Sequence, residues 1–184
     1  VYHGSAAGLS ATPNNTPDDA DQAGAHFGRS VASAGDVNGD GYSDVIIGAD
    51  LYTDGANTNE GRAFVYHGSA AGLSATPNNT PDDANQIEAF FGESVASAGD
   101  VNGDGSLDIV VGNVDQANSF YLNNGTSNPF NGVARKDISA DADDTWSVAL
   151  GDLDGDGDLD TVAGNMSETN RVYLNRSHDT GLGR

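Results

Sequence analysis

The sequence contains no cysteine, and its 184 residues include only seven lysines and arginines against 28 aspartates and glutamates. Without cysteine, the fold has neither disulfide bonds nor thiol chemistry. The formal net charge of -21 opposes binding to nucleic acid and to anionic lipid, because both are negatively charged. No apolar run approaches the roughly 18 residues of a membrane span. We therefore expect no nucleic-acid partner and no membrane span.

A long internal repeat organises the chain. Residues 1–48 match residues 65–112 at 38 of 48 positions, and the first 20 of these positions are identical. A fixed period of 64 residues indicates a repeat architecture, in which each unit packs on its neighbours. The chain starts with VYHG, which recurs at residues 65–68. We therefore expect the sequence to be a segment of a longer protein.

One acidic loop occurs three times, as DVNGDGYSD at residues 36–44, DVNGDGSLD at residues 100–108 and DLDGDGDLD at residues 152–160. In each loop, oxygen-bearing side chains occupy positions 1, 3, 5 and 9, glycine occupies position 6, and position 7 offers its carbonyl. A calcium ion takes about 6 to 8 oxygens at roughly 2.4 Å, and a tight turn delivers them only around a conformationally free residue. Gly41, Gly105 and Gly157 fill that place. The spacing predicts three calcium loops.

These loops differ from the EF-hand, which needs flanking helices and a bidentate glutamate at position 12. Position 12 is here Ile47, Val111 or Ala163, and each loop precedes a short apolar run at residues 45–48, 109–112 or 161–164. Such runs are typical of buried strands, so we expect each loop to join two strands. The alternative is an acidic surface turn without metal, which the threefold recurrence of the oxygen spacing disfavours.

Each full unit carries three clear strand patterns and a weak fourth. Small residues precede the loop at 30–35 and 94–99, the apolar run follows it, and residues 62–68 alternate as a strand with one buried face. Pro77 and Pro81 restrict the next stretch to an edge or a loop, because proline donates no ladder hydrogen bond. The small-residue strands suit the crowded axis of a radial β array.

This order of motifs resembles a known family. Phe-Gly at 27–28 and 91–92, the small-residue strand, GDVNGDGxxD and the apolar strand are similar to the FG-GAP repeat of integrin α-subunit β-propellers and bacterial relatives. Residues 146–160 resemble the VCBS-type variant of bacterial surface proteins. The resemblance implies an all-β fold of tandem four-stranded antiparallel blades, with calcium in the hairpin between the first two strands of each. Because closed propellers have about four to eight blades, we expect a partial or open array.

The resemblance also implies five calcium ligands per loop: the side chains at positions 1, 3, 5 and 9 and the carbonyl at position 7. They are Asp36, Asn38, Asp40, Tyr42 and Asp44, then Asp100, Asn102, Asp104, Ser106 and Asp108, then Asp152, Asp154, Asp156, Asp158 and Asp160. Five aspartates carry more charge than one calcium ion neutralises. We therefore expect the Asp158 side chain to point to solvent.

We divide the chain into four parts on this basis. Residues 1–24 are interpreted as the end of a preceding blade, 25–88 as a first FG-GAP repeat, 89–141 as a second, shortened hybrid repeat, and 142–184 as a third, incomplete VCBS-like repeat. Tyr66, Tyr121 and Tyr173 recur at corresponding strands, and we expect them to pack in the core or at an interface with the hydroxyl at the rim. Trp146, the single tryptophan, is also expected in the core.

Three functions stay open. The first is an extracellular or cell-surface calcium-binding repeat protein with a structural or adhesive role, whose loops bind a protein or glycan ligand. The second is a subunit of a calcium-stabilised filament built from repeats of the same or identical chains. The third is a lectin-like module or a module attached to an enzyme. We expect no catalysis by this chain, because 11 of its 28 acidic residues lie in the loops and its four glutamates show no recurring aspartate partner.

Overall fold

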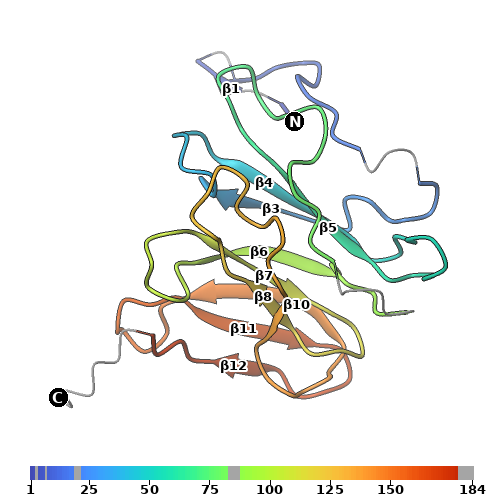
Figure 1. The fold of residues 1–184 in the computed structure, drawn as a ribbon, viewed down its shortest axis with the longest axis vertical. Coiled ribbons are helices and arrows are strands. Elements are labelled where there is room, and N and C mark those ends of the chain that lie inside the picture. Colours follow the sequence, from blue (N-terminus) through green and yellow to red (C-terminus); the bar gives the residue numbers. More distant parts are fainter. Residues whose placement is uncertain (3, 7, 19–21, 83–87, 178–184) are drawn as a thin grey trace.

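The computed structural model describes residues 1–2, 4–6, 8–18, 22–82 and 88–177 (Figure 1). These residues form β-strands and connecting loops. The strands are β1 (Gly4–Ser5), β2 (Gly8–Leu9), β3 (Ser30–Gly35), β4 (Asp44–Ala49), β5 (Arg62–Tyr66), β6 (Ser94–Gly99), β7 (Asp108–Gly112), β8 (Ser119–Tyr121), β9 (Lys136–Asp137), β10 (Thr145–Gly151), β11 (Asp160–Asn165) and β12 (Arg171–Tyr173). Within the described ranges, no helix has the length and apolar character needed to cross a membrane.

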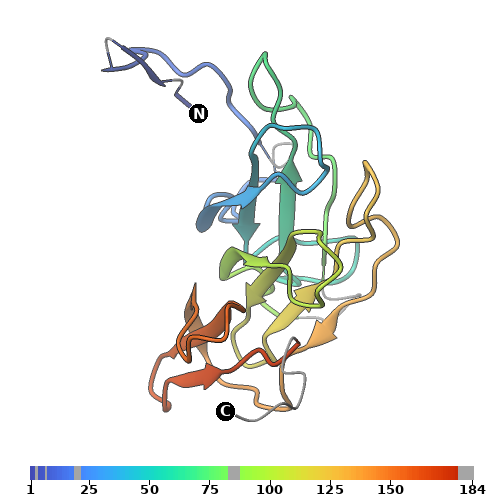
Figure 2. The ribbon, with the colours of Figure 1, turned by 90° about the vertical axis from the view of Figure 1, so that its left-hand side faces the viewer.

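Three antiparallel sheets follow one another along the chain. The first sheet has the order β3-β4-β5, the second β6-β7-β8-β9 and the third β10-β11-β12, while β1 and β2 form a separate hairpin. Figures 1 and 2 show the three sheets side by side in chain order. The predicted all-β fold with antiparallel sheets is therefore confirmed.

The fourth strand differs between the sheets. In the second sheet β9 pairs with β8, whereas the corresponding edge of the first sheet is formed by residues 79–81. There the amide of Val65 donates to the Asn79 carbonyl (2.9 Å) and the amide of Ala63 to the Pro81 carbonyl (3.0 Å). Proline has no amide hydrogen to continue the ladder, and the segment forms only an isolated bridge. The expected weak fourth strand is thus confirmed for these two units, but within the described residues only the second sheet has four strands, and the first and third have three.

The inner strands β3, β6 and β10 of neighbouring sheets are joined by a recurring hydrogen bond. The hydroxyl of Ser30 accepts from the Val95 amide (3.1 Å), and the hydroxyl of Ser94 accepts from the Val148 amide (3.0 Å). Small side chains allow these strands to approach closely, as predicted for the crowded side of the array.

Two apolar cores hold the first two sheets. The core between them contains Ala34, Val37, Ile46, Ala63, Val65, Phe91, Val95, Ile109, Val111, Tyr121 and Phe130. A second core covers the outer face of the first sheet, where the rings of Phe27 and Tyr52 each contact Phe64 edge-on, at centroid distances of 5.4 and 5.5 Å. The first sheet is consequently covered on both faces.

The expectation for the tyrosines is confirmed for two of them. Tyr66 and Tyr121 are buried, and their hydroxyls donate to the carbonyls of Asp18 and Asp82. Asp18 and Asp82 are 64 residues apart and hold the same repeat position. Tyr173 is half-buried, and its hydroxyl accepts from Ser139 Oγ (3.3 Å).

The expectation for Trp146 is wrong, because its side chain is 47% exposed. The register of β10 against β11 shifts between Thr145 and Ser147, so Trp146 is the extra residue of a bulge, and bulges re-aim side chains. Its ring instead lies under the Arg29 guanidinium, 5.3 Å from the ring centroid.

The division of the chain into four parts stays an interpretation. Residues 3, 7 and 19–21 of the first part, 83–87 of the second and 178–184 of the fourth lie outside the described residues.

Candidate metal loops

The three acidic loops join β3 to β4, β6 to β7 and β10 to β11. Each loop therefore connects two neighbouring antiparallel strands, as the sequence predicted. Figure 1 shows all three on the same side of the array.

In each loop, the carboxylate of the aspartate at position 1 accepts hydrogen bonds from backbone amides further along the loop, so the loop bends around it. Asp36 Oδ2 accepts from the Gly41 amide (2.8 Å) and Oδ1 from the Asp40 amide (3.0 Å). Asp100 makes the corresponding contacts at 2.7 and 3.0 Å, and Asp152 accepts from the amides at positions 4 and 6 of its loop at 2.7 and 3.2 Å. The middle glycines have positive φ angles of 91°, 90° and 99°, a conformation that favours glycine.

Positions 3 and 5 continue the same turn. The side-chain oxygen at position 3 accepts from the amide at position 5 at 3.1, 3.0 and 3.3 Å in the three loops. The carboxylate at position 5 accepts from the amide at position 7 at 2.9, 2.8 and 2.9 Å. The loop spacing thus brings alternate side chains to one side of the turn through local contacts alone.

The aspartate at position 9 plays a different part from the others. Asp44, Asp108 and Asp160 are fully buried. Oδ2 of each accepts from the amide at position 2 of its own loop, at 2.8–2.9 Å. Oδ1 accepts from an amide that follows the third strand of the sheet, at 2.7–2.8 Å. This carboxylate therefore ties the loop to the far strand of its sheet. Burial raises the pKa of Asp44 and Asp108, although the backbone amides that donate to them oppose the shift.

The third loop has the densest group of carboxylates. One oxygen each of Asp152, Asp154 and Asp156 lies within 4.8 Å of the others. Two ligands on opposite sides of a calcium ion are separated by about 4.8 Å, twice the metal–oxygen distance, so this spacing fits the ion. Asp160 is not a member of the group. Desolvation and the neighbouring Asp156 carboxylate raise the pKa of Asp154, a repulsion that a bound cation would relieve.

The second loop, with asparagine at position 3, is electrostatically milder. The amide Nδ2 of Asn102 donates to Asp104 Oδ2 (2.8 Å), and this bond, followed by the Ser106 amide, lowers the pKa of Asp104. Asn38 donates in the same way to Asp40 in the first loop (3.0 Å). The three loops therefore share a shape but differ in charge.

The expectation that Asp158 points to solvent is wrong. Its side chain is 7% exposed, and its Oδ2 accepts from Ser177 Oγ (3.1 Å). The chain that follows β12 folds back over position 7 of the third loop. There the Ser177 hydroxyl donates a hydrogen bond that replaces one the buried Asp158 carboxylate would otherwise accept from water. This contact joins residues 19 positions apart, which loop spacing does not reveal.

Sequence reasoning also missed Asn123 and Asn175, whose amides bind position 9. The signal was the Tyr-Leu-Asn triplet at residues 121–123 and 173–175, where the first unit has Tyr-His-Gly. The asparagines stand two residues after equivalent tyrosines, at the point where each third strand ends.

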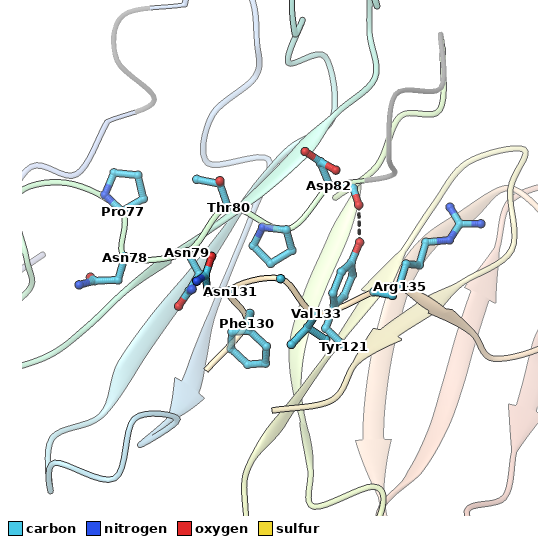
Figure 3. A pocket seen from close by; sticks show the side chains of 13 residues that line it. Pro77, Asn78, Asn79, Thr80, Asp82, Tyr121, Phe130, Asn131, Val133 and Arg135 are labelled. Atoms are coloured by element: carbon cyan, nitrogen blue, oxygen red, sulfur yellow. Dashed lines mark hydrogen bonds between the residues drawn. The ribbon is translucent and has the colours of Figure 1, made fainter. Parts of the chain in front are cut away.

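A separate concave region lies between residues 77–82 and 130–135, with a volume of about 570 Å³ (Figure 3). Two hydrogen bonds connect its walls to neighbouring segments: Tyr121 donates to the Asp82 carbonyl, and Asn79 Nδ2 donates to Asn128 Oδ1. We interpret it as a gap between the first two sheets that is bridged by structural hydrogen bonds.

Tandem antiparallel sheets, each with an acidic loop between its first two strands, define a β-repeat protein. Comparison with known proteins agrees: the FG-GAP repeat family matches residues 27–66, and the FG-GAP-like repeat family matches residues 100–163. The chain therefore contains FG-GAP repeats of the integrin-α-like β-propeller type.

Several integrin α subunits are similar to part of the chain. Integrin alpha pat-2 of Caenorhabditis briggsae is 40% identical over 100 residues, which cover 52% of this chain and 8% of that protein. Integrin alpha-E of Mus musculus is 38% identical over 95 residues, 50% of this chain and 8% of that protein. Integrin alpha-5 of Xenopus laevis is 34% identical over 89 residues, which cover 47% of this chain and 8% of that protein. The similarity therefore concerns the repeat and a small part of each relative.

Proposed function

We propose that the chain is a calcium-binding repeat module of an extracellular or cell-surface protein, with a structural and adhesive role and without catalytic activity. One Ca²⁺ stabilises each of the three repeats. The observation that carries this proposal is the position-9 aspartate, which ties each acidic loop to the third strand of its sheet. An ion held by the loop thereby stabilises the whole sheet. FG-GAP repeats related to integrin α propellers are typically extracellular and non-enzymatic, which supports the same reading.

The ligands in this proposal are the side chains at positions 1, 3, 5 and 9 and the carbonyl at position 7 of each loop, as set out above. At position 9, each carboxylate oxygen accepts one backbone amide and keeps a second lone pair for the ion. When bound, the ion neutralises carboxylates that otherwise repel one another in a chain of net charge -21. Near-millimolar extracellular calcium fills even weak sites of this kind.

Isothermal titration calorimetry of the chelator-stripped chain tests the proposal. We expect three calcium ions to bind per chain, and calorimetric melting in EGTA to show a much lower Tm than melting in calcium. A stripped chain that binds no calcium and melts at an unchanged Tm contradicts the proposal.

A second proposal, assembly with further repeats of the same or an identical chain, is favoured by the open face of the third sheet. Val172 is 56% exposed, whereas Val65, at the same strand position of the first sheet, is fully buried against the second sheet. Leu153 is 54% exposed, and its counterpart Val37 is 4% exposed. These side chains are apolar where a following sheet would cover them.

Sedimentation velocity over a range of concentrations, in calcium and in EGTA, tests this assembly. Calcium-dependent association that a Val172→Asp substitution abolishes supports stacking of repeats through this face. A monomer at every concentration contradicts self-assembly into a filament.

A further inference from the structure

Asn123 connects two metal loops that belong to different sheets. It is buried, and its backbone amide donates to Oδ1 of Asp108, the position-9 aspartate of the second loop (2.7 Å). Its side-chain Nδ2 donates to the carbonyl of Val37 in the first loop (2.7 Å) and to that of Leu107 (3.0 Å). Its Oδ1 accepts from the Gly125 amide (2.8 Å), which fixes the orientation of the side-chain amide.

Asn175 repeats this arrangement one sheet further on. Its backbone amide donates to Asp160 Oδ1 (2.8 Å), and its Nδ2 donates to the carbonyl of Val101 in the second loop (3.4 Å). Its Oδ1 accepts from the Ser177 amide (3.1 Å). Two independent copies of the contact show that it belongs to the repeat and is not a local accident.

Together these contacts form one chain of hydrogen bonds through all three loops. Val37 donates its amide to Asp44 and accepts from Asn123 at its carbonyl, and Asn123 in turn donates to Asp108. Val101 donates to the same Asp108 and accepts from Asn175, which donates to Asp160. The buried position-9 carboxylates are therefore connected in series.

A leucine at position 8 supports each link. Leu107 rests on Gly35, where an added Cβ would lie 2.4 Å from its Cδ1, and Leu159 rests on Gly99, at 2.8 Å. Gly35 and Gly99 immediately precede position 1 of their loops. A small cavity of about 140 Å³ between the first two loops is lined by residues of both, including Asp36, Asn38 and Leu107.

The first loop lacks both parts of this link toward the N-terminal side. It has Ser43 at position 8 and Gly68 at the position of Asn123 and Asn175. The Gly68 amide still binds Asp44 (2.7 Å), but glycine has no side-chain amide to reach another loop. The links thus run from each later loop to the one before it.

We propose that Asn123 and Asn175 are positioning residues that couple metal binding between neighbouring loops, so that an ion in one loop raises the affinity of the next. This inference rests on the proposed calcium function. An ion that orders the second loop holds Asp108, Asn123 and hence the Val37 peptide in place, so the first loop loses less freedom when it binds. Coupling through packed hydrogen-bond networks of this kind is reciprocal between sites and amounts typically to about fivefold or more.

Terbium luminescence measures the first site alone. Tb³⁺ takes the place of Ca²⁺, and Tyr42, at position 7 of the first loop, is the one aromatic residue within the three loops. Emission sensitised by Tyr42 reports occupancy of the first site, and the emission lost in Tyr42→Phe defines that signal. The affinity of this site is measured in the wild-type chain and in Asp104→Ala, which disables the second site.

We expect Asp104→Ala to weaken terbium binding at the first site by about fivefold. Asn123→Ala should weaken it similarly, and Asp104→Ala should then have no further effect in the Asn123→Ala background. Asn175→Ala is the matched control: it breaks the link between the second and third loops, so Asp104→Ala should keep its effect on the first site. Circular dichroism establishes that each variant is folded, and Asn123→Ser, which also lacks the Nδ2 donor, replaces Asn123→Ala if the latter unfolds.

Two results would overturn the coupling and leave the calcium function intact. One is a first-site affinity that Asp104→Ala does not change. The other is a double variant in which the effects of Asp104→Ala and Asn123→Ala on that affinity multiply. Wild-type chain without sensitised emission would overturn the proposed calcium function, and the coupling with it.

Discussion

The first and third sheets share a strand order and an acidic loop, yet only the first is covered on both faces. Its strands pack against the second sheet on one side and against Phe27, Tyr52 and Leu73 on the other. The third sheet contacts the second through β10 but leaves apolar side chains such as Leu153 and Val172 exposed. The repeat pattern thus builds a sheet by itself, whereas a core requires a neighbour on each face.

Calcium removal should have the largest effect and should separate the two sheets. Each bound ion stabilises the fold by about 2.7 kcal/mol when free calcium exceeds the dissociation constant about 100-fold. In EGTA we expect hydrogen exchange to rise more in β11 than in β4, because the third sheet has less buried apolar area and its loop carries five aspartates. Exchange measured by mass spectrometry with and without EGTA checks this. Equal increases in both strands would show that the loops, and not the cores, limit stability.

Aromatic truncation should distinguish the two sheets next. Phe64→Ala removes a buried ring from the core of the first sheet and should cost about 3–5 kcal/mol. Trp146→Ala removes an exposed ring that contacts the Arg29 guanidinium and should cost about 0.5–1 kcal/mol. Urea unfolding in calcium measures both values. A Trp146→Ala cost as large as that of Phe64→Ala would mean that another surface covers the third sheet in solution.

Two valines at the same strand position differ in burial between the first and third sheets. Val65→Ala should cost about 1.5–2.5 kcal/mol, since its side chain is fully buried. Val172→Ala should change stability by less than about 0.5 kcal/mol, as is usual for exposed positions. The same urea series measures both, at protein concentrations low enough to keep the chain monomeric. Equal losses of stability from the two substitutions would contradict the exposure of Val172 on the third sheet.

The pH dependence of the metal-free chain should have opposite signs in the two regions. Burial raises the pKa of Asp44 in the first sheet, so its ionised form opposes folding at neutral pH, and this penalty shrinks as pH falls through its folded-state pKa. A hydrogen bond from Arg171 lowers the pKa of Asp143 beside the third sheet. Its contribution to stability is present above the unfolded-state pKa and is lost as pH falls through the folded-state pKa.

Carboxyl NMR titration of the metal-free chain checks these directions, with Asp44 titrating above about 3.9 and Asp143 below it. Arg171→Gln should return Asp143 toward the ordinary value and leave Asp44 unchanged. A titration of Asp44 at or below the ordinary value would mean that its two backbone amide donors outweigh its burial.

The interior of each loop could be predicted from sequence because its contacts are local. Asp36 binds residues four and five positions away, so the order of side chains and the glycine at position 6 are enough to specify the turn. The strands on either side follow from their apolar and small-residue patterns. The edge position of Pro81 follows from its missing amide hydrogen.

The predictions from sequence that were wrong, and the residue that sequence reasoning missed, involve contacts between distant residues. Asp158 is covered by Ser177. Trp146 lies outside the core because of a bulge in the pairing of β10 with β11. Asn123 reaches Val37 across 86 residues. A repeated motif reveals neither a bulge in the pairing of its strands nor the segment that folds back over its loop, and it does not reveal which side chain reaches it from a neighbouring sheet.

By itself, the sequence determined the repeat period, the three loop turns and the antiparallel strands that they join, because hydrogen bonds within nine residues and the alternation of side chains specify them. Only the tertiary structure decided which apolar faces are buried, where Asp158 and Trp146 lie, and that Asn123 and Asn175 connect the loops. The reason is that burial and links between sheets depend on how far one sheet is displaced and rotated against the next, a quantity that no single repeat encodes.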